Sequence, residues 1–279
     1  MSNINPVILQ GRGVIAITGD DRKPFLQGLI TNNIYKATQE TALFSALLSP
    51  QGKFLYDFFI IEQGDVLLLE MDKASIAGFI KLLSLYKLRS RVALEESPDL
   101  GVAAVFGIRE AWKSGSREIV REYEDPRWPD LGKRIIFPIS RLPDFPTSPD
   151  AYDQHRISLT IPEGSKDLTY DRSLPMEWGY DRLNAIDFTK GCYVGQEVTA
   201  RSKHRAILRK MPCRIEAAVA LPSQGSSILN GEKEAGMVAS VYGTQAIALI
   251  QKEAISPETS LIINATPVKA ILPVWWKED

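Results

Sequence analysis

Short apolar runs and helical patterns follow one another irregularly through the first hundred residues. The runs have the length and the β-branched or aromatic content of strands. Asp20, Asp21 and Asp72 each stand where they can cap a helix that carries apolar residues at helical spacing. Strands are expected at residues 14–17, 42–48, 53–61, 66–69, 91–94 and 102–106. This irregular order predicts an α+β fold in which helices cover one face of a mainly antiparallel sheet.

The pattern changes beyond residue 206, where short strand-like runs are separated by turns that carry glycine or proline. That spacing is typical of a small all-β barrel or sandwich. Earlier in the chain, residues 143–150 place a proline at every third position, which makes a stiff and extended segment. We therefore expect an α+β region over residues 1–205, with a linker near 143–150, and a β domain over residues 206–279.

The composition is that of an ordinary soluble globular protein, with 44% apolar and 24% charged residues among 279. A net charge of −1 argues against nucleic-acid binding through overall charge. The apolar runs are far too short to cross a bilayer and residues 1–20 show no targeting pattern, so we expect a cytoplasmic protein with no membrane partner. Two cysteines and two histidines exclude a disulfide framework and any dense metal-ligand spacing.

Charge is uneven along the chain although it is balanced overall. Residues 144–187 carry nine acids and four bases, a net charge of −5, whereas residues 190–214 carry seven bases and one acid, a net charge of +6. Either these two segments are solvated faces that neutralise each other, or the second is a basic wall for an anionic ligand. Few aromatic residues are interleaved with the bases, so RNA binding through base stacking is poorly supported.

Asp57 interrupts a strand that is otherwise apolar on both faces. Period-two alternation places it on the same face as Leu55, Phe59 and Ile61. A buried carboxylate is costly unless it is paired or hydrogen-bonded. Asp57 is therefore either a structural residue bonded to a loop or an arginine, or a carboxylate that faces a ligand cavity with a raised pKa.

The octapeptide KGCYVGQE at residues 190–197, called here the signature segment, sets Cys192 between glycines and charged residues. A helix over residues 198–205 would place this cysteine near a helix N-terminus, and Lys190 stands close by in the chain; both favour the thiolate. The alternative is that Cys192 is a small buried hydrophobe, as lone cysteines usually are. That description fits Cys213 far better, because Cys213 precedes a strand-like run.

Three other side chains of the signature segment suit a flat, amide-bearing ligand. Tyr193 can stack on a heterocycle, and Gln196 and Glu197 can hydrogen-bond the edge of such a ring.

The signature segment resembles the motif of the YgfZ family, which are folate-binding relatives of the glycine-cleavage T-protein. The resemblance runs along most of the chain. Further matching stretches are residues 9–13, 19–22, 25–32, 47–53, 86–89, 125–127, 131–134, 175–177 and 199–201.

This resemblance implies a T-protein-like α+β fold with a ferredoxin-like subdomain, a central folate pocket and a C-terminal β-barrel. It divides the chain into a folate-binding region of two interleaved α+β subdomains over 1–205 and a barrel over 206–279. It also implies a tetrahydrofolate-binding protein that acts in assembly or repair of iron–sulfur clusters for a subset of cluster enzymes. Its partners would be folate and iron–sulfur client or assembly proteins.

Residue roles follow from the same resemblance. Cys192 would be the functional cysteine, and Asp57 falls where the T-protein places an acidic pair near the reacting end of folate, here with Tyr56 in place of the second acid. The expected folate-binding residues are Lys190, Tyr193, Gln196, Glu197 and Arg201. An alternative function is a folate-dependent aminomethyl or one-carbon transferase with Asp57 as base. Whether the protein turns over a substrate stays open.

Overall fold

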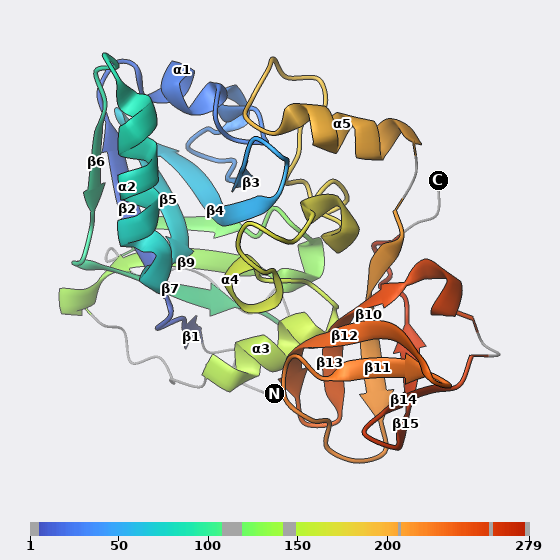
Figure 1. Cartoon of the computed structure of the whole chain (residues 1–279). Coiled ribbons are helices and arrows are strands. Elements are labelled where there is room, and N and C mark those ends of the chain that lie inside the picture. Colours follow the sequence, from blue (N-terminus) through green and yellow to red (C-terminus); the bar gives the residue numbers. More distant parts are fainter. Residues whose placement is uncertain (1–5, 108–118, 142–148, 206–207, 257–258, 277–279) are drawn as a thin grey trace.

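The computed structural model describes residues 6–107, 119–141, 149–205, 208–256 and 259–276. Two antiparallel sheets pack face to face at one end of the molecule, and a closed β-barrel lies at the other (Figure 1). The T-protein-like α+β fold with a C-terminal barrel is thereby confirmed. Of the expected linker near 143–150, residues 142–148 lie outside the described residues, and Pro149 opens a helix.

The first sheet has five strands in the order β3-β4-β5-β2-β6. Its strands are β2 (Arg12–Thr18), β3 (Leu43–Leu48), β4 (Phe54–Gln63), β5 (Val66–Asp72) and β6 (Ala93–Glu96). One face is covered by α1 (Arg22–Gln27) and α2 (Ile76–Lys87), whose buried residues pack on alternate strand positions such as Ile15, Phe58 and Leu69. The predicted strands and helices are therefore present, with ends shifted by a few residues.

The other face of the five-stranded sheet packs on a second sheet of order β1-β7-β9-β8. Its strands are β1 (Val7–Ile8), β7 (Leu100–Val105), β8 (Arg121–Glu124) and β9 (Lys133–Pro138). The chain starts in this sheet with β1, leaves it to build the five-stranded sheet, and returns with β7. Phe44 and Phe59 from one sheet meet Tyr123 and Ile136 from the other in a shared core.

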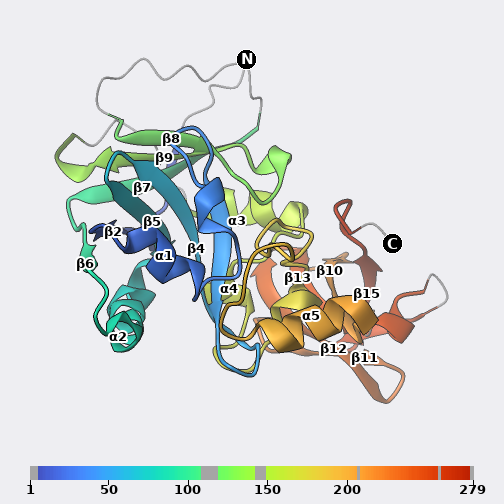
Figure 2. The same cartoon turned by 90° about the horizontal axis from the view of Figure 1, so that it is seen from above.

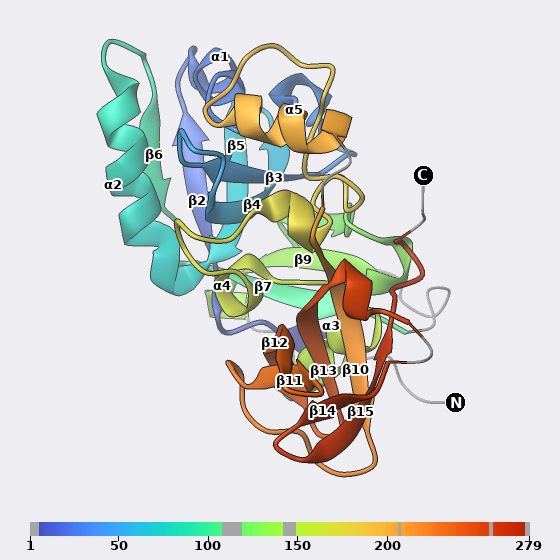
Figure 3. The same cartoon turned by 45° about the vertical axis from the view of Figure 1, so that its right-hand side comes forward.

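Three helices follow the two sheets and lead to the barrel. They are α3 (Pro149–Ser158), α4 (Gly164–Asp167) and α5 (Gln196–Arg205). The barrel closes in the order β10-β13-β12-β11-β14-β15. Its strands are β10 (Lys210–Ala217), β11 (Ser227–Asn230), β12 (Lys233–Tyr242), β13 (Gln245–Gln251), β14 (Leu261–Ile263) and β15 (Thr266–Ile271). Figure 3 shows α1 and α5 at the end of the molecule away from the barrel. Among the described helices, none is both long and apolar enough to span a bilayer.

A buried arginine is one of the contacts that join the barrel to the rest of the molecule. Arg156 of α3 donates to Asp167 of α4 at 2.7 Å and to the hydroxyl of Ser240 on β12 at 2.6 Å. Asp167 in turn accepts a 2.9 Å hydrogen bond from the backbone N–H of Ser240. Arg156 and Asp167 are both buried, so neither charge has water as a substitute partner.

Removing this arginine should destabilise the fold strongly. We expect Arg156→Ala to lower the free energy of unfolding by about 3–5 kcal/mol, because Asp167 then stays buried without its cation. Urea unfolding followed by circular dichroism measures the change. Arg201→Ala is the control, since its pair with Glu197 is exposed and should contribute less than about 1 kcal/mol. Equal effects of the two substitutions would contradict this account of the junction.

Candidate functional site

Asp57 lies on β4, on the face that turns toward the second sheet. Its Oδ2 accepts hydrogen bonds from the backbone N–H of Gly164 at 3.0 Å and from the Tyr180 hydroxyl at 2.9 Å. Among the described residues, its Oδ1 accepts none. Burial raises the pKa of Asp57, although the Arg12 charge and the Tyr180 hydrogen bond act in the opposite direction. The structural interpretation thus applies, because the carboxylate is held by the loop at Gly164 and by Tyr180. That Asp57 faces a ligand cavity stays a prediction.

Neighbouring positions on β4 show why Asp57 has no acidic partner on its own strand. Tyr56 lies on the opposite face, where its ring packs against Phe79 of α2 at 5.4 Å and Tyr170 at 5.5 Å. The expected alternation holds for Asp57, Phe59 and Ile61 but not earlier, because a register shift between β3 and β4 brings Phe54 into the core on the side of Asp57.

A network of buried charges surrounds Asp57 between the two sheets. Glu70 of β5 accepts from Arg12 of β2 at 2.9 Å and also from Arg134 of β9 and the Tyr123 hydroxyl. The buried arginines are Arg12, Arg127, Arg134 and Arg156, and the buried acids around them are Asp57, Glu70, Asp125, Glu163 and Asp167. Asp57 is the acid of this group that forms no ion pair among the described residues, which agrees with its raised pKa.

Asp125 holds two of these arginines in place. It accepts from Arg127 at 2.8 Å and from Arg134 at 3.0 Å, and both guanidinium groups also donate to the Tyr152 hydroxyl. Burial by itself would raise the pKa of Asp125, but the charges of Arg127 and Arg134 bring it down to about 2. The carboxylate is therefore ionised at neutral pH and keeps the two like-charged arginines together.

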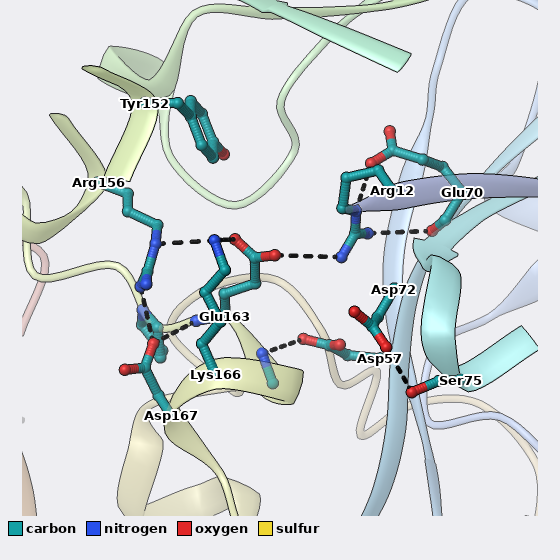
Figure 4. Close-up of polar contacts among 12 residues, drawn as sticks. Arg12, Asp57, Glu70, Asp72, Ser75, Tyr152, Arg156, Glu163, Lys166 and Asp167 are labelled. Atoms are coloured by element: carbon teal, nitrogen blue, oxygen red, sulfur yellow. Dashed lines mark hydrogen bonds and ion pairs between the residues drawn. The ribbon is translucent and has the colours of Figure 1, made fainter. Parts of the chain in front are cut away.

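Glu163 connects the network to the barrel junction. Its carboxylate lies between Arg12, at 3.6 Å, and Arg156, at 3.7 Å, and Figure 4 shows it pointing into the space between them. Against the effect of burial, the charges of Arg12, Lys166 and Arg156 hold the pKa of Glu163 below its ordinary value. Gly164 follows directly, and a Cβ there would approach the Asp57 carboxyl carbon to 2.6 Å, so this close approach requires glycine.

The signature segment lies elsewhere, against α1 and the turn before β4. Lys190 is buried, and its ammonium donates to the backbone carbonyls of Gln27, Ile30 and Asn32 at 2.6–2.9 Å. Burial lowers the pKa of Lys190 to about 8, while the nearby Asp187 acts against that decrease. The Lys190 side chain therefore anchors the signature segment. These hydrogen bonds do not test its predicted contact with folate.

The other expected folate-binding residues occupy the same stretch of surface. Tyr193 is buried, and the Lys190 ammonium lies 5.1 Å from the centroid of the Tyr193 ring. Burial raises the pKa of Tyr193 to about 12. Gln196 is the first residue of α5. Glu197 and Arg201, one helical turn apart, form an exposed ion pair with a distance of 2.5 Å between nitrogen and oxygen. Among the described residues, no hydrogen bond or ion pair joins these side chains to Asp57.

Cys192 is exposed at the tip of this anchored loop, whereas Cys213 is buried in the barrel. Gly195, with φ +83°, allows the loop to touch the turn before β4, since a Cβ there would lie 2.6 Å from the Ser49 carbonyl oxygen. Figure 2 shows the segment that leads into α5 next to α1. The structure therefore presents this thiol to solvent from a loop that is fixed at both ends.

Part of the basic stretch 190–214 is neutralised by ion pairs. Lys203 pairs with Asp181 at 3.2 Å and Arg214 with Glu216 at 3.0 Å. The Lys203 pair links the basic stretch directly to the preceding acidic one. Both interpretations of the two segments stay predictions.

A groove of about 450 Å³ is lined by residues of β3 and by Asn184 and residues 186–189, which precede the signature segment. Phe188 is an exposed aromatic residue on its lining, whereas the Phe44 side chain is buried, and Lys36 pairs with Asp187 at 2.8 Å. Phe44 also packs on Tyr180, at 5.5 Å between ring centroids, and Tyr180 donates to Asp57. Asp57 does not line this groove, so a folate site that uses both the groove and Asp57 stays a prediction.

Sequence reasoning missed most of the charged network. Glu70 follows the apolar run 66–69 and Arg134 precedes the apolar residues 135–137, so each breaks an apolar strand as Asp57 does. A search for charged residues within apolar strands, which identified Asp57, would also have identified Glu70 and Arg134. Arg156 and Glu163 carry no such signal, since they lie in a polar helix and a loop.

Comparison with known proteins first identifies the class of fold. The solved structure described as glycine cleavage system aminomethyltransferase T from Bartonella henselae superposes with a TM-score of 0.78, over 98% of this chain and 86% of that chain. The two sequences are 13% identical, so the likeness concerns the fold alone. Residues 209–278 match the family described as CAF17, C-terminal beta-barrel domain.

Sequence relatives define the family. The iron–sulfur cluster assembly factor IBA57, mitochondrial, of Mus musculus is 30% identical over 96% of this chain and 84% of its own length. The homologue from Neurospora crassa is 35% identical over 78% of this chain and 56% of its own length. The chain therefore belongs to the IBA57 family of iron–sulfur cluster assembly factors. YgfZ, to which the sequence analysis pointed, is a related family.

The expectation of a cytoplasmic location is wrong. The relatives from Mus musculus, Pyricularia oryzae and Coccidioides immitis are all named as mitochondrial proteins. Composition and the pattern of the first residues do not report the compartment in which such a protein works.

The anchor role of Lys190 can be tested directly. We expect Lys190→Met to lower the free energy of unfolding by about 1–3 kcal/mol, because three buried carbonyls lose their donor. Amide hydrogen exchange at residues 191–195 should become faster. Lys36→Met is the control: its ion pair with Asp187 is half exposed, and its loss should leave exchange in the loop unchanged. Unaltered exchange in Lys190→Met would show that the loop is held by other contacts.

Proposed function

We propose that this protein assists the assembly of iron–sulfur clusters on other proteins, that it binds tetrahydrofolate, and that Cys192 is its reactive thiol. Membership of the IBA57 family supports the first part, since the relatives carry that name. The exposed position of Cys192 on an anchored loop is the observation that carries the proposal.

The cysteine count supports assistance to other proteins over permanent storage of a cluster. Clusters are commonly held by four thiolates, and this chain has two cysteines. Cys213 is enclosed in the barrel, and burial raises its pKa to about 12. Within the described ranges, no three of His, Cys, Asp and Glu gather as a metal site would require. Cys192 is thus the thiol that another protein or its cluster can reach.

Tetrahydrofolate is proposed to bind with its pterin against Asp57, as the resemblance to the T-protein implies. When bound, tetrahydrofolate supplies a carrier for one-carbon units. Asp57 would accept from the pterin edge through Oδ1, and Tyr180 and Gly164 would keep the carboxylate oriented through Oδ2. A T-protein-like transferase activity has less support, because Tyr56 stands in place of the second acid and faces away from Asp57.

The role of the thiol predicts a separation of folding from function. We expect Cys192→Ala to unfold within about 0.5 kcal/mol of the wild type, because the side chain is exposed. The variant should nevertheless fail to restore the activity of iron–sulfur enzymes in cells that lack their own copy of this factor. Enzyme activities in extracts of complemented cells are the measurement.

Gly191→Ala is the matched control, since a Cβ at Gly191 meets no atom within 4 Å. It changes the neighbouring residue of the same loop and should complement as the wild type does. Full complementation by Cys192→Ala would remove the thiol from the proposal.

Folate binding predicts a calorimetric signal. We expect tetrahydrofolate and 5-formyltetrahydrofolate to bind the purified protein, and Asp57→Asn to weaken binding by roughly tenfold or more, as a lost hydrogen bond to a charged group would. Asp72→Asn is the control: this carboxylate ends β5, accepts from the Ser75 hydroxyl, and should leave affinity unchanged. Absence of heat with both folates at high protein concentration would exclude the cofactor.

A further inference from the structure

The C-terminal end of α2 exposes apolar side chains that the fold does not use. Leu85 is 70% exposed, Leu88 is 89% exposed and Tyr86 is 38% exposed. Residues 81–91, called here the α2 tip, form an outer corner of the molecule far from the barrel (Figures 1 and 3). Adjacent exposed apolar side chains of this size are a common mark of an interaction surface.

Leu88 also has a backbone conformation that leucine rarely adopts. Its φ is 44° and its ψ is −109°, and the Ser90 N–H donates to the Lys87 carbonyl at 2.8 Å. These values describe a type II′ turn with Leu88 at the first central position, where glycine is strongly preferred. A leucine at this position costs stability and buries nothing in return, so its side chain is explained by something outside the chain.

Cations surround the apolar side chains. Residues 81–91 contain four bases and no acid. Arg91 pairs with Asp20 and Asp21. The other three bases, Lys81, Lys87 and Arg89, have no ion pair among the described residues. The α2 tip is therefore apolar at its apex and positively charged around it.

We propose that the α2 tip docks on an anionic lipid surface, with Leu85 and Leu88 inserted among the lipids and Lys81, Lys87 and Arg89 against the phosphates. An interfacial contact of this kind combines buried apolar area with attraction to anionic headgroups. A second copy of this chain fits less well, because it would bring two sets of unpaired cations together. The expectation of no membrane partner rested on the length of apolar runs, which has no bearing on a peripheral contact.

Vesicle co-sedimentation of the full-length protein tests the proposal. We expect binding to vesicles of phosphatidylcholine mixed with phosphatidylglycerol, little binding to phosphatidylcholine alone, and weaker binding as salt is raised. Leu88→Gly should lower the affinity by about tenfold, the value of one inserted leucine side chain. The same substitution should leave the midpoint of thermal unfolding unchanged or raise it, because glycine suits the turn. Loss of binding therefore cannot come from loss of the fold.

Two alanine substitutions distinguish a specific contribution of the α2 tip to vesicle binding from a contribution of any exposed apolar side chain. Leu85→Ala should weaken vesicle binding, and Val274→Ala, at a position that is 71% exposed near the end of the chain, should not. Failure of the wild type to bind the anionic vesicles at low salt overturns the proposal. Wild-type affinity in Leu88→Gly overturns it as well, as does equal binding to neutral and anionic vesicles.

Discussion

The requirement that buried charges be matched governs the centre of this protein. Two sheets, the helices α3 and α4, and the barrel meet where four arginines and five acids are enclosed. Each arginine serves at least two elements: Arg134 joins Glu70 of the first sheet to Asp125 of the second, and Arg156 joins α4 to the barrel. Since an unpaired buried charge costs several kcal/mol, roughly 3–5 when one partner is removed, these pairs specify how the parts fit together.

This constraint also accounts for the unusual state of Asp57. Four of the five acids form ion pairs with guanidinium groups. The remaining carboxylate has two hydrogen bonds and the charge of Arg12 nearby, which do not offset burial, so its pKa is raised. A buried group with one oxygen already held and one available is suited to recognising the N–H edge of a ligand. Cys192 differs from Asp57 because its side chain is exposed. The buried ammonium of Lys190 fixes the loop, and the sulfur stays in contact with water.

Three sites on the molecule therefore have separate physical bases. Asp57 is a buried acid held by two hydrogen bonds, the Cys192 loop is held by Lys190 and exposes its thiol to solvent, and the α2 tip is apolar and cationic. Figure 2 places α1 between the α2 tip and the segment that leads into α5. A protein held at a lipid surface by the tip would keep the barrel directed away from it, because the two lie at opposite ends.

The sequence by itself determined the elements, the change from α+β to β-barrel and the two residues that break their local pattern, Asp57 and Cys192. These features can be predicted from the sequence because buried positions recur every few residues in helices and strands. Only the tertiary structure decided which charges meet: Arg134 reaches Glu70 across 64 positions and Lys190 reaches the Ile30 carbonyl across 160. Such pairs leave no local period. For this reason the sequence did not show that the Lys190 ammonium donates to three backbone carbonyls.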